Sequence, residues 1–319
     1  MFLKFLKFSI IIFLFYYTNN YLDYDYIIQY FEKLNLKLYL FITQPLIILS
    51  VLLSTKRLSL LINNNSFNKK TFIIITKSII LSNGLAVILP ARLSEFIKPF
   101  YLFKNSLVSF HKALSILFLE RLGDALIIFI FSAFASIFFI EYNFLFFNII
   151  IMISLIIIIL LYFFKNLLFE VINKYFPFKL FNFLNDISTE FYHLLSTINL
   201  IKFFCYGFMI WLLSLINVII SVYFFNLEFI GIKGILEIFL GTIIAGAIPG
   251  MPGNFVTFES IVIFILKTYN VDFNQSFIFS LCLHLNQLLL FISLTILVLI
   301  KEDFNLNKSM FEIKHLLKK

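Results

Sequence analysis

The sequence predicts an all-α fold: a polytopic transmembrane helical bundle with about six full crossings and two proline-broken re-entrant hairpins. Three observations predict it. The chain is 61% hydrophobic, its mean hydropathy is +1.01, and only 13% of its residues are charged, a composition outside the range of soluble domains. Prolines interrupt two strongly apolar regions, and lysines and arginines gather between apolar segments. Residues 1–319 are therefore expected to form a single membrane domain.

The apolar segments differ in length, and length decides which of them can cross. A hydrocarbon core of about 30 Å needs about 20 helical residues. The uncharged run 144–164 meets this requirement most clearly. Residues 2–18 are interpreted as a retained first helix, because no small-residue cleavage site follows them. The expected crossings are residues 2–18, 37–55, 113–140, 143–164, 201–226 and 277–300.

The basic loops decide the topology, because cytoplasmic loops collect lysine and arginine. The basic stretches are residues 56–70, 92–112, 165–202 and the tail 301–319. A full crossing by residues 71–90 would put two neighbouring basic loops on opposite faces, so this segment is expected to return to the cytoplasmic side. Residues 234–267 are expected to form a second hairpin from the opposite side. Both termini are then cytoplasmic, and the membrane is the inner, cytoplasmic one.

Residues 165–200 mix charged side chains with regularly spaced Phe, Leu and Ile. This pattern is typical of a helix that lies on a membrane surface, here the cytoplasmic one. The tail 301–319 is expected to be a short basic cytoplasmic segment.

The two breaks carry the most information about function. Residues 248–259 read Ile-Pro-Gly-Met-Pro-Gly-Asn-Phe-Val-Thr-Phe-Glu, and proline and glycine at this density prevent a continuous helix. In lipid, a broken backbone is tolerated only where it is buried in protein or lines a wet cavity, as at the substrate sites of transporters. The residues expected to break the helices are Pro90, Pro249, Gly250, Pro252 and Gly253.

Ionisable residues follow the first break. Arg92, Glu95 and Lys98 are three residues apart, which on a helix would stack plus, minus and plus along one face. The cations would suit a phosphate, although an interfacial charge pair that ends the segment is the alternative.

A second group of ionisable residues lies in the next apolar segment. Glu120 and Asp124 share a helix face, and Arg121 or Arg92 could neutralise them. The functional and the purely structural interpretation of this group both remain open.

Glu259 follows the second break at a helix start, where free amide donors attract anions. It is expected either to contact a substrate or to brace the break. On the last helix, His284 and Gln287 share a face and are expected to form interhelical hydrogen bonds. The candidate residues for substrate binding or transport are therefore Arg92, Glu95, Lys98, Glu120, Arg121, Asp124 and Glu259.

Several function classes find no support in the sequence. The GxxxxGK[ST] phosphate loop, HExxH and GxSxG are all missing, which argues against nucleotide hydrolysis and two large hydrolase classes. Cys205 and Cys282 have no metal-ligand or redox spacing. The net charge of +8 is explained by the membrane-flanking loops, so no nucleic-acid partner is expected. No cofactor and no metal are expected either.

Three motifs, taken together, point to a family. Leu89 to Glu95 with Lys98 resembles a Leu-Pro-x-Arg-Leu-Gly-Glu-x-x-Arg motif, and Glu120 to Asp124 resembles Glu-Arg-Leu-x-Asp. Pro249 to Glu259 resembles Pro-x-x-Pro-Gly-Gly-x-Gly-x-x-Glu. All three are similar to motifs of the lysylphosphatidylglycerol synthase transmembrane family, the flippase-like membrane proteins, over residues 70–300. The departures from the family pattern are Ser94, Asn254 and Val256 in place of glycine and Lys98 in place of arginine.

The resemblance implies a polytopic helical fold and a role in moving lipids across the membrane, without the aminoacyltransferase domain of some relatives. We expect a lipid flippase that binds a lipid with an anionic or glycosylated head group. One alternative is a membrane-embedded transferase acting on a lipid phosphate, with Glu120 or Asp124 as base or metal ligand. Another is an accessory subunit of an envelope-lipid assembly complex.

Overall fold

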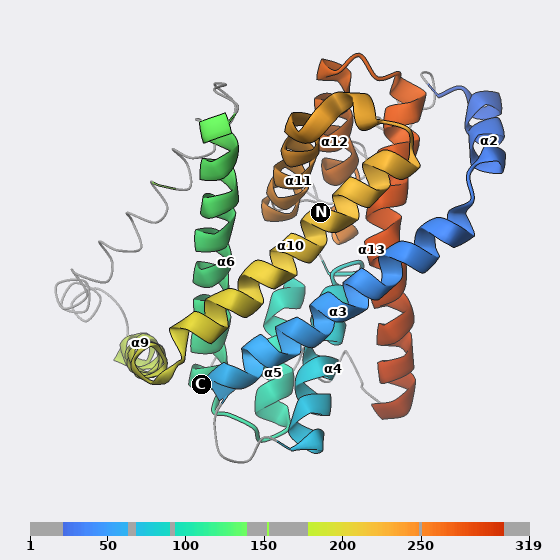
Figure 1. Cartoon of the computed structure of the whole chain (residues 1–319). Helices are drawn as coiled ribbons and strands as arrows, with labels where there is room; N and C mark the ends of the chain where they lie inside the picture. The colour runs from blue at the N-terminus through green and yellow to red at the C-terminus, as the bar shows by residue number, and fades with distance from the viewer. Residues whose placement is uncertain are drawn as a thin grey trace.

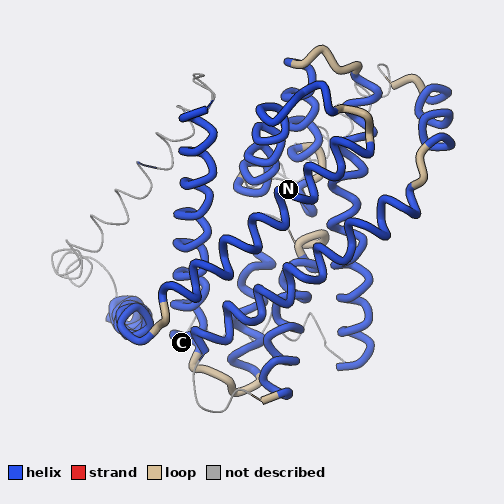
Figure 2. Tube along the Cα trace, viewed as in Figure 1, coloured by secondary structure: helices blue, strands red, loops and turns tan. Residues whose placement is uncertain are grey.

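The computed structural model describes residues 22–62, 68–89, 93–138, 152, 178–248 and 251–302. The expected crossings 2–18 and 143–164, and most of the basic tail, lie outside these residues. Every regular element within them is helical (Figures 1 and 2), which confirms the predicted class.

Two series of helices follow one another along the chain. The first comprises α2 (Tyr24–Lys33), α3 (Leu36–Ile62), α4 (Lys69–Leu85), η1 (Leu93–Phe96), α5 (Ile97–Lys104) and α6 (Phe110–Phe138). The second comprises α9 (Phe178–Thr197), α10 (Leu200–Phe224), η2 (Glu228–Ile230), α11 (Gly231–Ala247), η3 (Pro252–Asn254), α12 (Thr257–Thr268) and α13 (Phe273–Glu302).

The two series repeat the same order of lengths. A long helix, α3 or α10, leads to a 17-residue helix, α4 or α11. The chain then breaks and returns through a short arm, which is η1 with α5 in the first series and the 12-residue α12 in the second. A helix of 29 residues, α6, or of 30 residues, α13, completes each series.

The two halves have opposite directions in space. α3 and α10 pack against each other and run antiparallel, while α4 and α11 enter the molecule from opposite ends (Figure 1). The packing follows the same symmetry, because α4 with α5 and α5 with α6 match α11 with α12 and α12 with α13. The fold is therefore an inverted repeat, an arrangement common in transporters.

Each half has its own hydrophobic core. One core gathers Ile79, Leu81, Ile97 and Tyr101 around the α4–α5 hairpin. The other gathers side chains such as Phe239 and Val262 around the α11–α12 hairpin. The breaks lie between these cores, and Figure 2 shows loop segments inside the molecule as well as at its ends.

Side-chain caps explain where several helices begin. Asn68 accepts a hydrogen bond from the Thr71 amide at 2.9 Å at the start of α4, and Asn199 accepts one from the Lys202 amide at 3.0 Å at the start of α10. Such caps satisfy backbone donors that have no partner inside the helix.

One helix crossing is very close. A Cβ atom on Gly84 of α4 would overlap Thr295 of α13, and the Thr295 hydroxyl donates to the Ile80 carbonyl at 3.0 Å. Small residues at such a crossing let two backbones approach. α13 is thereby held against the first hairpin.

Within the described residues, four stretches are long and apolar enough to cross a membrane: Leu36–Ile62, Leu200–Phe224, Glu228–Ala247 and Phe273–Lys301. The protein is thus a multi-pass membrane protein, as predicted. The total of six crossings and the depth of the hairpins stay predictions. α9 confirms a helix over part of residues 165–200, and it packs against α6, where the Ser115 hydroxyl donates to the Ile187 carbonyl at 2.7 Å.

Candidate functional site

The tips of the two hairpins touch. The amide of Gly253 donates a hydrogen bond to the carbonyl of Ala86 at 2.8 Å, which joins the segment after α4 to η3. Gly253 has φ +71°, a left-handed conformation that glycine adopts without steric cost. The predicted breaks at Pro252 and Gly253 therefore form a contact between the halves. Pro90, Pro249 and Gly250 lie outside the described residues.

Two residues of the second tip that are not glycine have positive φ angles. Asn254 has φ +57° and Val256 has φ +72°, and these are two positions where the family motif has glycine. Asparagine tolerates this region, but a β-branched residue there is a steric outlier. The amide of Val256 donates to Glu259 Oε2 at 2.7 Å, so Glu259 braces the break, one of the two roles predicted for it.

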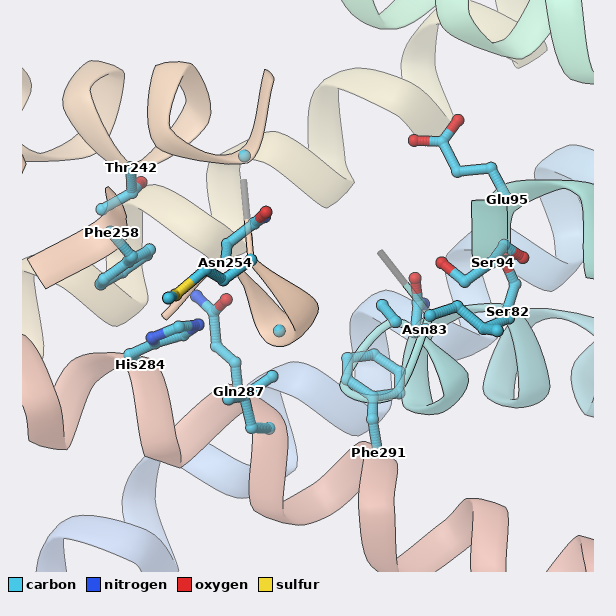
Figure 3. Close-up of a pocket in the computed structure, with 16 residues that line it drawn as sticks. Ser82, Asn83, Ser94, Glu95, Thr242, Asn254, Phe258, His284, Gln287 and Phe291 are labelled. Carbon is cyan, nitrogen blue, oxygen red and sulfur yellow. Dashed lines mark hydrogen bonds between the residues drawn. The ribbon is translucent and has the colours of Figure 1, made fainter. Parts of the chain in front are cut away.

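A polar cavity of about 280 Å³ lies between the hairpin tips (Figure 3). The first hairpin contributes Asn83, Ser94 and Glu95, while Asn254 comes from the second tip and Gln287 from α13. These are mainly uncharged hydrogen-bonding groups with one carboxylate. The cavity could therefore hold a polar, hydrogen-bonding chemical group at the junction of the repeats.

His284 of α13 also lines this cavity and pairs with Glu259. Its Nδ1 lies 2.7 Å from Glu259 Oε1, and its ring stacks on Phe258 with centroids 4.2 Å apart. The residue is only 4% exposed. Glu259 thus has both oxygens engaged, one by the broken backbone and one by the imidazole.

A buried ion cluster lies beside the cavity, centred on a residue that the sequence analysis assigned to a loop. Arg57 donates to Asp124 at 2.7 Å and to Glu120 at 2.9 Å. Lys98 donates to the other oxygen of Glu120 at 2.7 Å. Glu120 and Asp124 share a helix face, as predicted, and Arg57 pairs with both of them, while Arg121 lies 3.6 Å from Asp124.

The surroundings of Arg57 fit its guanidinium closely. The group lies over the Phe203 ring, 5.4 Å from the centroid. A Cβ on Gly207 would come within 2.5 Å of Ile127 Cδ1 and 2.9 Å of Arg57 Nη1, so α10 passes close to both side chains. Trp211 of α10 donates its indole hydrogen to Asp124 at 3.2 Å, and α3, α6 and α10 are thereby joined at one point.

Arg121 connects this cluster to the cavity. It lies 3.7 Å from Glu95 and 3.6 Å from Asp124, with 42% of its side chain exposed. Glu95 is in η1 and lies near Arg121, while Lys98 is in α5 and pairs with Glu120. Arg92 lies outside the described residues.

A second cavity, also of about 280 Å³, lies between α3 and α10. Its walls combine aliphatic side chains such as Ile47 and Leu213 with Trp211 and several small polar side chains such as Ser50. Asn83, Gln287 and Phe291 line both cavities. The polar cavity is therefore adjacent to a more apolar one, with these three side chains between them.

Within the ranges that the structure describes, no cluster of three or more His, Cys, Asp or Glu residues has the geometry of a metal site.

A comparison with known protein families found a match. The family described as lysylphosphatidylglycerol synthase TM region matches residues 4–295. The chain belongs to this family. Its membership identifies a membrane protein acting on lipids, and the match extends beyond residues 70–300, where the motifs lie. No curated protein and no solved structure matches the chain.

Sequence reasoning missed several residues of this site, notably Arg57, Trp211, Asn83 and the partner of Glu259. A signal for Arg57 does exist. The residues after it, Leu-Ser-Leu-Leu-Ile, continue the apolar pattern of α3 to Ile62. An arginine inside such a helix is expected to face the protein interior with a carboxylate partner.

Proposed function

We propose that this protein translocates an amphipathic lipid across the membrane, with the head group in the polar cavity between the hairpin tips. The observation that carries the proposal is the contact of Gly253 with Ala86 beside that cavity. Broken segments that meet at the junction of an inverted repeat are how many transporters build their substrate sites. The family, which acts on lipids, supports the same function.

The two cavities suit the two parts of a lipid. Serine, asparagine and glutamine side chains in the first can donate hydrogen bonds to a phosphate ester or a sugar, and the Glu95 carboxylate can accept one from a sugar hydroxyl. Aliphatic side chains in the second offer a surface for the start of an acyl or polyprenyl chain. Asn83, Gln287 and Phe291, which line both, would contact the junction between head group and chain.

The charged residues fall into two groups: those in buried ion pairs, and those that we propose to contact the head group. Lys98 and Arg57 are paired with buried carboxylates, and this favours a structural role for them. Arg121, which is partly exposed beside Glu95, and Arg92, from the segment between Leu89 and Leu93, are the cations that we propose for an anionic head group.

Glu120 and Asp124, which a lipid-phosphate transferase would use, are both engaged by Arg57. This favours translocation over the alternative of a transferase. We further propose that both hairpins are re-entrant and that both termini face the cytoplasm across the inner membrane, in keeping with the basic loops.

Reconstitution into vesicles tests the proposed function. Fluorescent lipid in the inner leaflet of phosphatidylglycerol–phosphatidylethanolamine vesicles is protected from a membrane-impermeant quencher outside. Purified protein in the vesicles is expected to carry this lipid to the outer leaflet and so to accelerate its quenching. Gln287→Leu removes one head-group hydrogen bond and is expected to slow translocation about tenfold, as a loss of about 1.4 kcal/mol would.

The matched control is Gln29→Leu on the exposed face of α2, which is expected to match the wild type. The proposal fails if wild-type vesicles move no labelled phospholipid or lipid-linked sugar faster than vesicles without protein.

A further inference from the structure

Within the described part of the chain, His284 uses only one of its two ring nitrogens. Its Nδ1 contacts Glu259 at 2.7 Å, and Nε2 has no hydrogen-bond partner among the described residues. The side chain is more than nine-tenths buried, yet it lines the polar cavity, whereas Glu259 does not. Figure 3 shows the imidazole beside Gln287 at the cavity wall. The free edge of the ring is therefore the edge that the cavity can reach.

The pairing of His284 with Glu259 determines which ring nitrogen can accept a proton. A carboxylate at Nδ1 favours the tautomer with hydrogen on Nδ1, which leaves Nε2 as an acceptor. A proton that binds Nε2 makes the ring a cation with a second donor, and Glu259 then compensates this charge. Protonation thus changes the group presented to the cavity from an uncharged acceptor to a positive donor.

Few other described groups around the cavity can titrate. Glu259 comes from α12, and Glu95 of η1 lies across the cavity (Figure 3). On α13 itself, Cys282 is buried two residues earlier. The cavity-lining residues of α4, α11 and η3 are uncharged: Ser82, Asn83, Thr242, Gly253 and Asn254. Imidazole is the side-chain group whose unperturbed pKa lies closest to physiological pH, and His284 is the one described lining residue that carries it.

The first half has a different partner at the corresponding place. Glu95 is the third residue of its returning arm, as Glu259 is of α12, and each pairs with the long helix that follows. In the first half that partner is Arg121, which stays charged at all physiological pH values. In the second half it is a histidine. One repeat therefore has a permanent cation and the other a titratable one.

We propose that His284 is a proton-binding site, and that a proton bound at its Nε2 is carried together with an anionic lipid head group. The inference rests on the proposed lipid translocation and adds its energy source. The proton enters from water on the side where the head group binds and leaves Nε2 to water on the opposite side. Glu259 keeps its charge throughout, so one proton and one lipid cross together.

A pH gradient across vesicles tests this coupling. For one proton per lipid, the steady-state ratio of fluorescent phosphatidylglycerol between the leaflets is expected to change about tenfold per pH unit, because one pH unit is worth about 1.4 kcal/mol. His284→Gln keeps a hydrogen-bonding side chain that does not titrate. It is expected to leave the ratio near that of vesicles without a gradient. His193→Gln, at an exposed position of α9, is the control and is expected to respond as the wild type does.

The outcomes separate the two proposals. Wild type and His284→Gln with the same gradient response would overturn the proton site and leave lipid translocation standing. Absence of any lipid movement in the wild type would instead remove the proposed function. The proton site is then judged by histidine-selective NMR, in which the signal missing from His284→Gln must titrate between pH 5 and 8. A signal that does not move in that range overturns the inference.

If His284→Gln fails to fold, Glu259→Gln replaces it, because the variant keeps the shape of the dyad and removes the charge that stabilises the imidazolium. It is expected to change how the NMR signal of His284 responds to pH. An unchanged titration would contradict the proposed pairing.

Discussion

Arg57 of α3 and Asp124 of α6 are bonded at 2.7 Å although 67 residues separate them in the sequence. The pair is buried, and Glu120 occupies the second amino group of the same guanidinium. Two carboxylates on one helix face would repel each other in an apolar interior, so each of them needs this cation. Arg57 thus helps to fix the position of α6 relative to α3.

Replacing Arg57 is therefore expected to destabilise the protein strongly. Arg57→Met leaves two carboxylates without their main partner, and breaking a buried ion pair costs about 3–5 kcal/mol. The free energy of unfolding, measured by titration with denaturing detergent in mixed micelles, is the appropriate readout. Lys56→Met, at the exposed neighbouring position, is expected to have little effect. Equal loss in both variants would show that the pairing is not the cause.

Lys98 and Glu120 are expected to be energetically coupled. Each single change, Lys98→Met or Glu120→Met, leaves the other charge buried with an incomplete set of partners. The double variant removes both and is expected to cost less than the sum of the two, with a coupling of about 0.5–3 kcal/mol. Additive losses in the unfolding free energy would argue for separate roles of the two residues.

The glycines at equivalent places of α4 and α11 are expected to respond differently to alanine. At Gly84 the new methyl group would overlap Thr295, and overpacking of this kind costs about 1–3 kcal/mol. At Gly246 a Cβ meets no described atom within 4 Å. Gly246→Ala is therefore expected to be neutral, or stabilising by up to about 1 kcal/mol through helix propensity. Thermal unfolding midpoints of the two variants give the comparison, and a larger loss at Gly246 would contradict it.

Val256→Gly is expected to stabilise the protein. Valine at φ +72° carries a strain of about 1–3 kcal/mol, which exceeds the entropic cost of glycine of about 0.5–1 kcal/mol. Asn254→Gly, at φ +57°, is expected to gain less, because asparagine already tolerates this conformation. A rise in the unfolding midpoint for Val256→Gly that is no larger than for Asn254→Gly would show that the valine is not strained.

Patterns within a few residues of sequence predicted the helix break, one shared helix face and one bracing residue. Prolines and glycines predicted the break at Pro252 and Gly253, and four-residue spacing predicted the common face of Glu120 and Asp124. A helix start after the break predicted that Glu259 could brace it. In each case the cause and the effect lie within one or two helical turns.

The pairs that assemble the site could not be found in this way. Glu259 meets His284 across 25 residues, and Arg57 meets Asp124 across 67, so neither pairing leaves a local pattern. The cluster of lysines and arginines predicts a loop over residues 56–70, which include Arg57. In the structure, α3 continues to Ile62. The repeat was hidden for a related reason. It is a repeat of helix lengths, which become visible only when the ends at Asn68 and Asn199 are known.

The inverted repeat predicts a second arrangement of the chain, in which the two halves exchange their geometries. Ser132 has the same place in α6 that Thr295 has in α13, at the twenty-third residue of each helix. If the halves exchanged their geometries, Gly84 would part from Thr295, and Gly246 would come to rest on Ser132. The contact between α4 and α13 would then be lost as a contact between α11 and α6 formed. A small residue already stands on both sides of each crossing, so the reverse arrangement requires no larger side chain to move aside.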